Sequence, residues 1–306
     1  MITFGLLLTT ASGLGWVAAD ALRKRLATNL TALELAAGLH LFQIPIVLVG
    51  LVFGHLFLEQ GELQEMLSWK IETAYWMVAL PSVLCNALAN LLFVRALQLS
   101  DLSLTIPYLS LTPVLALLSS WLIVGEVPAA AGIVGVAVIA IGALVLNPSG
   151  SNGPGFYPLR ALKEEKGSLA MLGVACLWSI SVAFDKRALE HGSPIAHTAV
   201  LAVTGAFILN QARRRRSHAV LMTQLRPVMG VLLVTTLVIT AALIAQLWSY
   251  HYLPVAYVEA IKRSLGMLGA VAVGWWFFNE GSMGRRLAAV ATMAIGVCLI
   301  LLTEGG

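Results

Sequence analysis

Residues 129–146 read AAAGIVGVAVIAIGALVL, eighteen consecutive residues without a charge. As a helix, such a run rises about 27 Å, close to the thickness of a bilayer core. Similar runs recur along the 306-residue chain, which is 59% hydrophobic and only 11% charged, with a mean hydropathy of +0.87. A water-soluble chain of this length needs far more charged side chains to cover its surface. The sequence therefore predicts an all-α integral membrane protein.

Apolar runs separated by charge, proline or glycine predict ten transmembrane helices. The first run is followed by basic residues and has none before it, so we expect it to stay in the protein instead of being cleaved as a signal peptide. Residues 147–167, rich in proline, glycine and serine, are typical of a linker between two halves, 1–146 and 168–306. The predicted spans are 3–20, 31–53, 74–96, 102–124, 129–146, 168–185, 194–211, 228–251, 255–278 and 287–303.

Lysine and arginine are distributed unequally over the connections between these spans. Fourteen lie after the odd-numbered spans and three after the even-numbered ones. Because cytoplasmic connections are enriched in these residues, both termini are predicted to face the exterior, in what we expect to be a bacterial inner membrane. Basic residues placed this way indicate topology and contact with membrane lipid, and they argue against nucleic acid as a partner.

The two halves of the sequence repeat each other. AVIAIG at 137–142 lies 154 residues before ATMAIG at 291–296, and the same offset aligns Glu126 with Glu280. Both glutamates precede the last span of their half, where we expect them to fix turns. The chain is thus predicted to be built from two homologous five-helix units.

The repeat also predicts the relative orientation of the halves. An offset of 165 aligns Asp20 in the first span with Asp185 in the sixth. Because each half has an odd number of spans, the second half enters the membrane from the opposite face, so the repeats are inverted. Inverted repeats are typical of secondary transporters, with the substrate site near the midplane between the halves.

These features together resemble the EamA-type drug/metabolite transporter superfamily. The resemblance rests on five plus five helices, first spans with small residues and tryptophan, the proline-containing SLTIPYLSLTP at 103–113, and apolar runs ending in GE or NE before each last span. It implies a ten-helix bundle whose central cavity is walled by helices 1, 3, 4, 6, 8 and 9, with helices 5 and 10 peripheral. It implies no particular substrate.

A charged cluster lies inside the ninth predicted span. Glu259, Lys262 and Arg263 stand well inside the span 255–278, where charges are costly unless they face a cavity or a partner. Glu259 precedes the two cations by three and four residues, so it can pair with one and leave the other partly free. The surplus cation favours a subsite for an anionic group of the substrate, whereas an intramembrane salt bridge that fixes packing is the alternative. The consecutive Lys-Arg is also similar to that of the plastid sugar-phosphate translocators, a resemblance that implies phosphate as a ligand.

Further substrate-binding candidates lie on helices expected to border the cavity. For each of them, core packing, lipid contact or interhelical hydrogen bonding is the alternative. They are Trp16, Asn90, Tyr108, Trp178, Gln246, Tyr250 and Tyr257. Glu34 and His40 of the second span are weaker candidates for proton relay, with local pairing as the alternative.

The leading functional hypothesis is a secondary transporter that moves a small anionic metabolite by alternating access. No Walker motif is present, and three isolated cysteines suggest no redox or metal site, so no cofactor or metal is expected. A flippase-like carrier of a lipid or lipid-linked phosphate is the second hypothesis. A membrane-embedded enzyme is the third, although HExxH and GxSxG motifs are absent. The sequence gives no indication of oligomeric state.

Overall fold

A computed structural model describes residues 2–26, 29–58, 61–99, 106–146, 166–213, 218–278 and 283–304. These residues form helices joined by turns and short connections, with one isolated antiparallel bridge between Ile71 and Gly192. The predicted linker lies outside the described residues up to position 165. In chain order the elements are α1 (Ile2–Leu26), α2 (Ala32–Phe57), α3 (Glu62–Leu67), α4 (Tyr75–Leu99), η1 (Ile106–Leu111), α6 (Thr112–Ile123), α7 (Ala130–Leu146), α9 (Lys166–Leu189), α10 (Pro194–Ala212), α11 (His218–Leu225), η2 (Arg226–Val228), α12 (Met229–Ser249), α13 (Val255–Phe278) and α14 (Met283–Glu304).

The outer surface of the helices is apolar. Large side chains at least 64% exposed include Leu7, Val49, Phe57, Met77 and Leu122. Such a surface is stable against lipid and not against water, so the chain is a multi-pass membrane protein.

Length and composition identify six helices of the described residues that can cross a bilayer, and three shorter apolar helices accompany them. The ten crossings expected from the sequence therefore stay a prediction. The six are Ile2–Arg23, Leu33–Phe57, Tyr75–Phe93, Lys166–Leu189, Pro194–Ala212 and Leu221–Ser249, and the shorter three are Tyr108–Ile123, Ala130–Gly142 and Ala291–Ile300.

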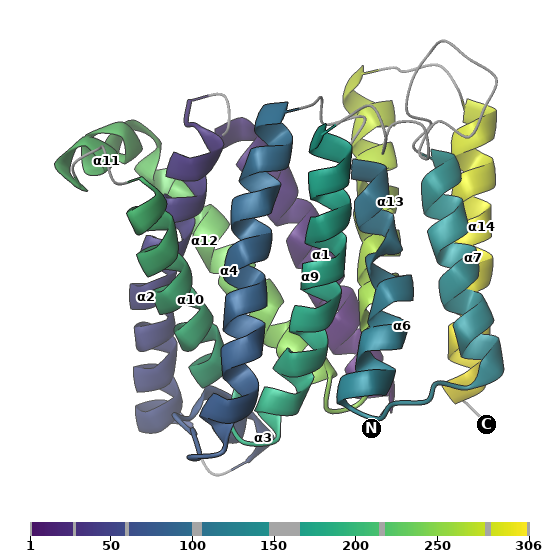
Figure 1. Ribbon diagram of the computed structural model, residues 1–306, viewed down its shortest axis with the longest axis horizontal. Coiled ribbons are helices and arrows are strands. Elements are labelled where there is room, and N and C mark those ends of the chain that lie inside the picture. Colours follow the sequence, from purple (N-terminus) through teal and green to yellow (C-terminus); the bar gives the residue numbers. More distant parts are fainter. Residues whose placement is uncertain are drawn as a thin grey trace.

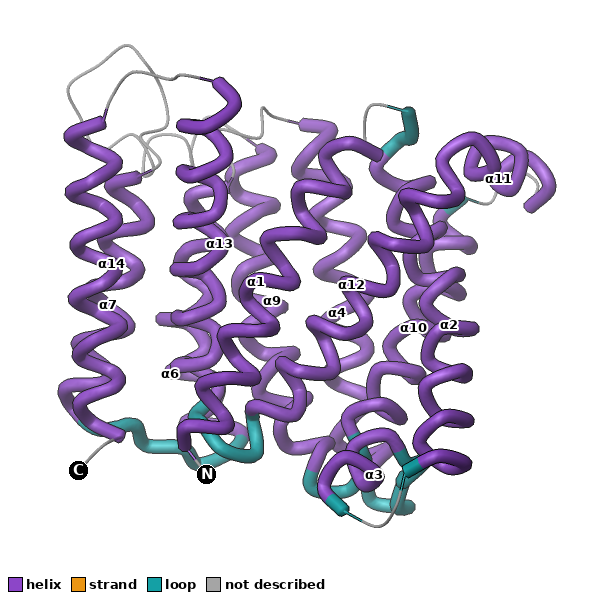
Figure 2. The backbone as a smooth tube through the Cα atoms, turned by 180° about the vertical axis from the view of Figure 1, so that it is seen from behind, coloured by secondary structure: helices purple, strands orange, loops and turns teal. Residues whose placement is uncertain are grey.

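The long helices stand side by side, and both chain ends lie at the same end of the bundle (Figure 1). α7 and α14 form one edge of the bundle, whereas α2 and α10 form the other (Figure 2). Between the edges, α1 packs on α12 and α13, and α9 packs on α4 and α6. In each of these pairs one helix comes from each half of the chain. The interior of the bundle is therefore made of contacts between the halves.

The helix ends follow local sequence signals. Thr31 caps α2, with its hydroxyl accepting a hydrogen bond from the Glu34 amide at 3.3 Å. The Glu34 carboxylate in turn accepts from the Thr31 amide at 3.0 Å, which completes a capping box. Glu34 thus has a local role at the start of α2, which is the alternative to proton relay.

The fourth predicted span, 102–124, departs from a single α-helix. Its described part begins with the 3-10 segment η1, which contains Pro107, and continues as α6, whose second residue is Pro113. Proline lacks the amide hydrogen needed for the α-helical ladder, so the two prolines favour tighter turns before the regular helix.

The pair formed by α7 and α14 depends on two glycines. A methyl group placed on Gly296 would lie 2.6 Å from the carbonyl oxygen of Gly135, and one placed on Gly135 would lie 2.7 Å from that of Gly296. Small residues of this kind let helix backbones approach closely in a membrane. Both positions must therefore be glycine, which has no side chain beyond a hydrogen atom, for α7 and α14 to lie at the observed spacing.

We expect Gly296→Ala to destabilise the protein by about 1–3 kcal/mol, because the new methyl group meets backbone that cannot move without shifting a helix. The measurement is the apparent melting temperature of the purified protein in detergent. Gly230→Ala in α12 is the matched control, since a methyl group there meets nothing within 4 Å. Equal melting temperatures for the two variants would contradict the tight contact.

Candidate functional site

The charged cluster lies in the first turns of α13. The start of this helix is held by Glu126, whose Oε2 accepts a hydrogen bond from the Val255 amide at 3.1 Å. Glu259 and Lys262 follow on one face of the helix, and their Oε1 and Nζ atoms lie 2.5 Å apart. Their side chains are only 2% and 13% exposed. The three-residue spacing thus produces a buried ion pair within one helix.

Gln246 of α12 and Tyr250, the residue directly after this helix, complete the surroundings of Glu259. Gln246 and Tyr250 lie four residues apart on one face, and both donate to Oε1 of Glu259, at 3.2 and 3.0 Å. The Gln246 amide nitrogen also lies 2.7 Å from the Tyr250 hydroxyl. With Lys262, three donors converge on one carboxylate oxygen, and charge-assisted hydrogen bonds of this kind are strong in a low-dielectric interior.

α1 closes the cluster through Trp16. The Trp16 indole N–H donates to Oε1 of Gln246 at 3.0 Å, and Lys262 donates to the same oxygen at 2.9 Å. The Lys262 ammonium also lies 6.0 Å from the centroid of the Trp16 ring, at the outer limit of a cation–π contact. The polar cluster therefore joins α1, α12 and α13, that is, both halves of the chain.

The second cation, Arg263, has a different environment. Within the described residues its Nε is buried and has no hydrogen-bond partner. Arg263 also interacts unfavourably with the neighbouring Lys262 charge. The geometry thus has Glu259 paired with Lys262 and leaves Arg263 as the surplus cation.

Four other candidates lie apart from this cluster. Tyr257 points to α7, where its hydroxyl occupies the space that a side chain on Gly132 would fill. Asn90 donates to the carbonyl and the side-chain oxygen of Asn86, one turn earlier in α4, at 2.9 and 2.8 Å. The remaining two are aromatic residues of the apolar core between η1, α4 and α9, namely Tyr108 and Trp178.

A second polar cluster joins α4, α9 and α10. Asp185 accepts a hydrogen bond from Ser82 and contacts His197, which in turn contacts Tyr75. In the sequence, Asp185 serves only to align the two halves, and no pattern marks Ser82, His197 or Tyr75 as site residues. The signal was weak because the members come from three different spans, and only packing brings them together.

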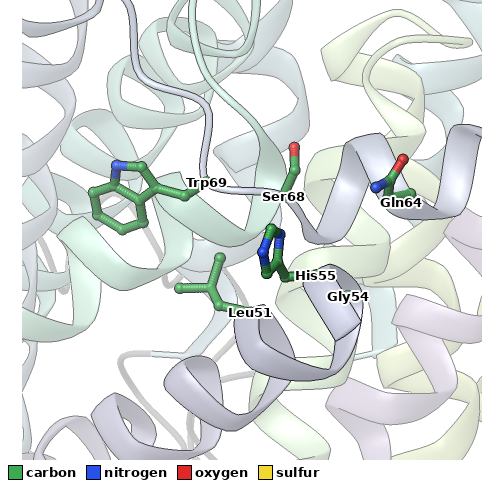
Figure 3. A pocket seen from close by; sticks show the side chains of 6 residues that line it. All are labelled: Leu51, Gly54, His55, Gln64, Ser68 and Trp69. Carbon is green, nitrogen blue, oxygen red and sulfur yellow. The ribbon is translucent and has the colours of Figure 1, made fainter. Parts of the chain in front are cut away.

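A hollow at the end of the bundle holds none of these residues. It lies between the end of α2 and the short helix α3 (Figure 3). The lining residues are Leu51, Gly54, His55, Gln64, Ser68 and Trp69. The hollow is therefore distinct from both polar clusters.

We expect Gln246→Leu to lower the free energy of unfolding by about 1–3 kcal/mol, because it leaves the indole of Trp16 and one hydrogen bond of Lys262 without an acceptor. Thermal unfolding in detergent measures the effect. Gln43→Leu is the control: Gln43 is equally buried, at 4% exposed, but its Nε2 has no partner among the described residues. The cluster would be unimportant for stability if both variants melted alike.

Comparisons with known proteins give the family of this fold. No curated protein matches the chain. A solved crystal structure, described simply as that of a protein, superposes with a TM-score of 0.72 at 17% sequence identity, over 98% of each chain. At that identity the likeness establishes a shared fold. The EamA-like transporter family matches residues 3–147 and 165–302, that is, both halves of the chain. The chain, a multi-pass membrane protein, belongs to the EamA-like transporter family.

Proposed function

We propose that this membrane transporter is a secondary carrier that moves a small anionic metabolite by alternating access between two inverted five-helix repeats. The observation that carries the substrate class is the surplus of positive charge in the buried cluster of α13. The symmetry of the helix contacts supports the mechanism.

The helix contacts match when the halves are exchanged. We match the helices of the two halves in chain order: α1 with α9, α2 with α10, α4 with α12, α6 with α13 and α7 with α14. The contact between α1 and α12 then corresponds to that between α9 and α4, and the contact between α1 and α13 corresponds to that between α9 and α6. The pairs α2–α10 and α7–α14 each correspond to themselves. A two-fold axis in the membrane plane produces such a pattern, and inverted repeats of this kind support alternating access.

The cluster supports an anionic substrate because its charges do not balance. Lys262 uses two of its three N–H groups on Glu259 and Gln246 within the described residues. Arg263 adds a second cation, whereas Glu259 is paired with Lys262. An uncompensated cation in the bilayer interior is stable only where water or an anion reaches it. A phosphate or carboxylate group is the complementary ligand.

The direction of the chain in the membrane follows from the basic residues. Both chain ends lie at one end of the bundle, and α11, which follows the basic run starting at Arg213, lies at the other (Figure 1). With fourteen of the connection lysines and arginines after odd-numbered spans, the positive-inside rule supports exterior termini in a bacterial inner membrane.

Ligand binding is the first test. Thermal-shift titrations of the purified protein with sulfate, inorganic phosphate, glycerol 3-phosphate, succinate, glucose and a short-chain phosphatidic acid give apparent affinities. We expect one or more of the soluble anions to raise the melting temperature and glucose to have no effect. Stabilisation by phosphatidic acid alone would favour the lipid carrier instead. Stabilisation by glucose alone, or by none of the ligands, would overturn the anionic substrate.

Substitutions in α13 test the residues themselves. Lys262→Ala and Arg263→Ala should each weaken binding of the stabilising anion by about 30-fold or more, the equivalent of at least about 2 kcal/mol. Glu259→Gln should weaken it less, or strengthen it, because it releases Lys262 from its partner. Lys70→Ala and Arg187→Ala remove the same residue types from exposed ion pairs and serve as controls. Unchanged affinity in both α13 cation variants would leave the salt bridge as a packing element only.

Orientation has its own test. A reporter enzyme that folds only outside the cytoplasm, fused after Gly306, should be active because the C-terminus is expected outside. A fluorescent protein that matures only in the cytoplasm should stay dark at the same position. Fluorescence of this second fusion would reverse the proposed orientation.

A further inference from the structure

The cluster around Asp185 is buried as completely as the cluster around Lys262. Asp185 of α9 is 3% exposed, and His197 of α10 and Tyr75 of α4 are fully buried. Nε2 of His197 lies 2.9 Å from Oδ1 of Asp185, and its Nδ1 lies 2.7 Å from the Tyr75 hydroxyl. Ser82 donates to the same Asp185 oxygen and lies 3.1 Å from the hydroxyl of Ser181. An acid, an imidazole and a phenol thus form one hydrogen-bonded chain inside the bundle.

When the His197 ring is neutral, the donors and acceptors of this hydrogen-bonded chain define where its protons lie. A carboxylate only accepts, so Nε2 of His197 carries a hydrogen that it donates to Asp185. In a neutral imidazole the other nitrogen accepts, so the Tyr75 hydroxyl donates to Nδ1. With a neutral ring all of these hydrogen bonds are satisfied, and the cluster then carries the single negative charge of Asp185.

No fixed cation compensates that charge by direct contact. Within the described part of the chain, no lysine or arginine forms an ion pair with Asp185. The next residue, Lys186, points instead to Glu126 and the Leu253 carbonyl at the end of the bundle. A buried charge without a partner is costly, and one proton added to His197 removes the net charge of the cluster.

The cluster lies at the interface between the two halves. Tyr75 and Ser82 belong to the first half, whereas Asp185 and His197 belong to the second. Tyr75 is the first residue of α4, and His197 is the fourth residue of α10. Because a helix rises 1.5 Å per residue, the hydrogen-bonded chain ends within about 6 Å of the ends of these two helices. Protonation there would change a contact across which the halves have to move.

Other titratable groups on the packed helices couple to this cluster. Asp185 interacts electrostatically with Cys85, Tyr250 and Lys262. The glutamates of α3 are exposed, and α6 contains no charged residue. Titratable residues on the surrounding helices include Tyr75 and Cys85 of α4, His40 of α2, Lys186 of α9, Tyr250 directly after α12, and Glu259 and Lys262 of α13. The electrostatic link to Lys262 connects the two clusters.

We propose that Asp185 and His197 bind one proton, and that this proton is carried in the same direction as the anionic substrate. In the loading step a proton from water forms an N–H bond at Nδ1 of His197. The Tyr75 oxygen then accepts where its hydroxyl had donated, and the net charge of the cluster changes from −1 to 0. In the unloading step the same N–H bond breaks, and the proton returns to water on the other side of the membrane. No other bond is made or broken.

The sign of the coupling follows from Lys262. Asp185 belongs to α9, which contacts α12 and α13, so its negative charge lowers the positive potential that Lys262 offers to a substrate anion. Protonation of His197 removes that effect, so proton and anion each favour binding of the other. This coupling rests on the proposed function, whereas the proton site itself does not.

The proton site is tested without any substrate. The chain has six histidines, and nuclear magnetic resonance of histidine-labelled protein in lipid nanodiscs follows each ring. His197→Gln identifies the His197 signal by its loss. We expect this signal in the wild-type protein to change with pH, as that of a ring that gains and loses one proton does. In Asp185→Asn the titration midpoint should move to lower pH, because the imidazolium loses its counter-charge.

A matched pair on the surface provides the control. His191 contacts the Glu72 carboxylate at 3.0 Å, a similar His–carboxylate pair, but the two side chains are 31% and 50% exposed. His191→Gln should remove a different signal and leave the His197 titration unchanged. A His197 ring that keeps one protonation state at every pH at which the wild-type protein is folded would overturn the proton site.

The coupling is tested with sulfate, a probe whose own charge is constant over this pH range. Wild-type protein should bind sulfate about 5-fold or more tightly at pH 6 than at pH 8, and His197→Gln should bind it equally at both. Equal wild-type affinities combined with a titrating His197 would overturn the coupling and keep the proton site. No binding of any anion, combined with a titrating His197, would instead refute the proposed substrate class and, with it, the coupling.

Discussion

A polar side chain that is moved from water into a bilayer must find its hydrogen bonds within the protein. This constraint shapes the interior of the bundle, because a lone carboxylate or ammonium there costs several kcal/mol. Glu259 meets the constraint with three donors on one oxygen, and Asp185 meets it with a serine and a histidine. The helices that supply these partners are thereby held in register. The hydrogen bonding of buried polar groups and the packing of the helices therefore depend on each other in this protein.

Each of the two clusters bridges a pair of helices from different halves of the chain. Trp16 and Gln246 bond across the pair α1–α12, and Ser82 and Asp185 bond across α4–α9. If the halves are related as proposed, these helix pairs are equivalent, yet their chemistry differs. The first pair adjoins the cations of α13, whereas the second holds the acid Asp185 next to the titratable His197 of α10. Under the proposed function, this division assigns anion binding to one side of the scaffold and proton binding to the other.

The edges of the bundle differ from its interior. α7 and α14 meet through the backbone contact of Gly135 and Gly296, with apolar residues such as Val136 and Ile139 around them. Tyr257 joins this apolar group instead of the polar cluster two residues further along α13. Because successive helical residues point about 100° apart, α13 presents one face to the edge pair and another to α1 and α12. The helix thus connects the edge formed by α7 and α14 with the candidate site.

The sequence alone determined whatever depends on neighbours along the chain. Apolar run length predicted a membrane protein and placed α13 at its observed bounds, and helical periodicity placed Glu259 within reach of a cation three or four residues later. The family expected from the repeat is confirmed, whereas the inverted arrangement and the substrate class stay predictions. Tertiary structure decided what depends on packing between distant helices. It selected Lys262 over Arg263 as the partner of Glu259, added Gln246, Tyr250 and Trp16 to the cluster, and brought His197 to Asp185. Spacing along a helix constrains which side chains share a face, but the partner of that face is set only when helices from the two halves pack.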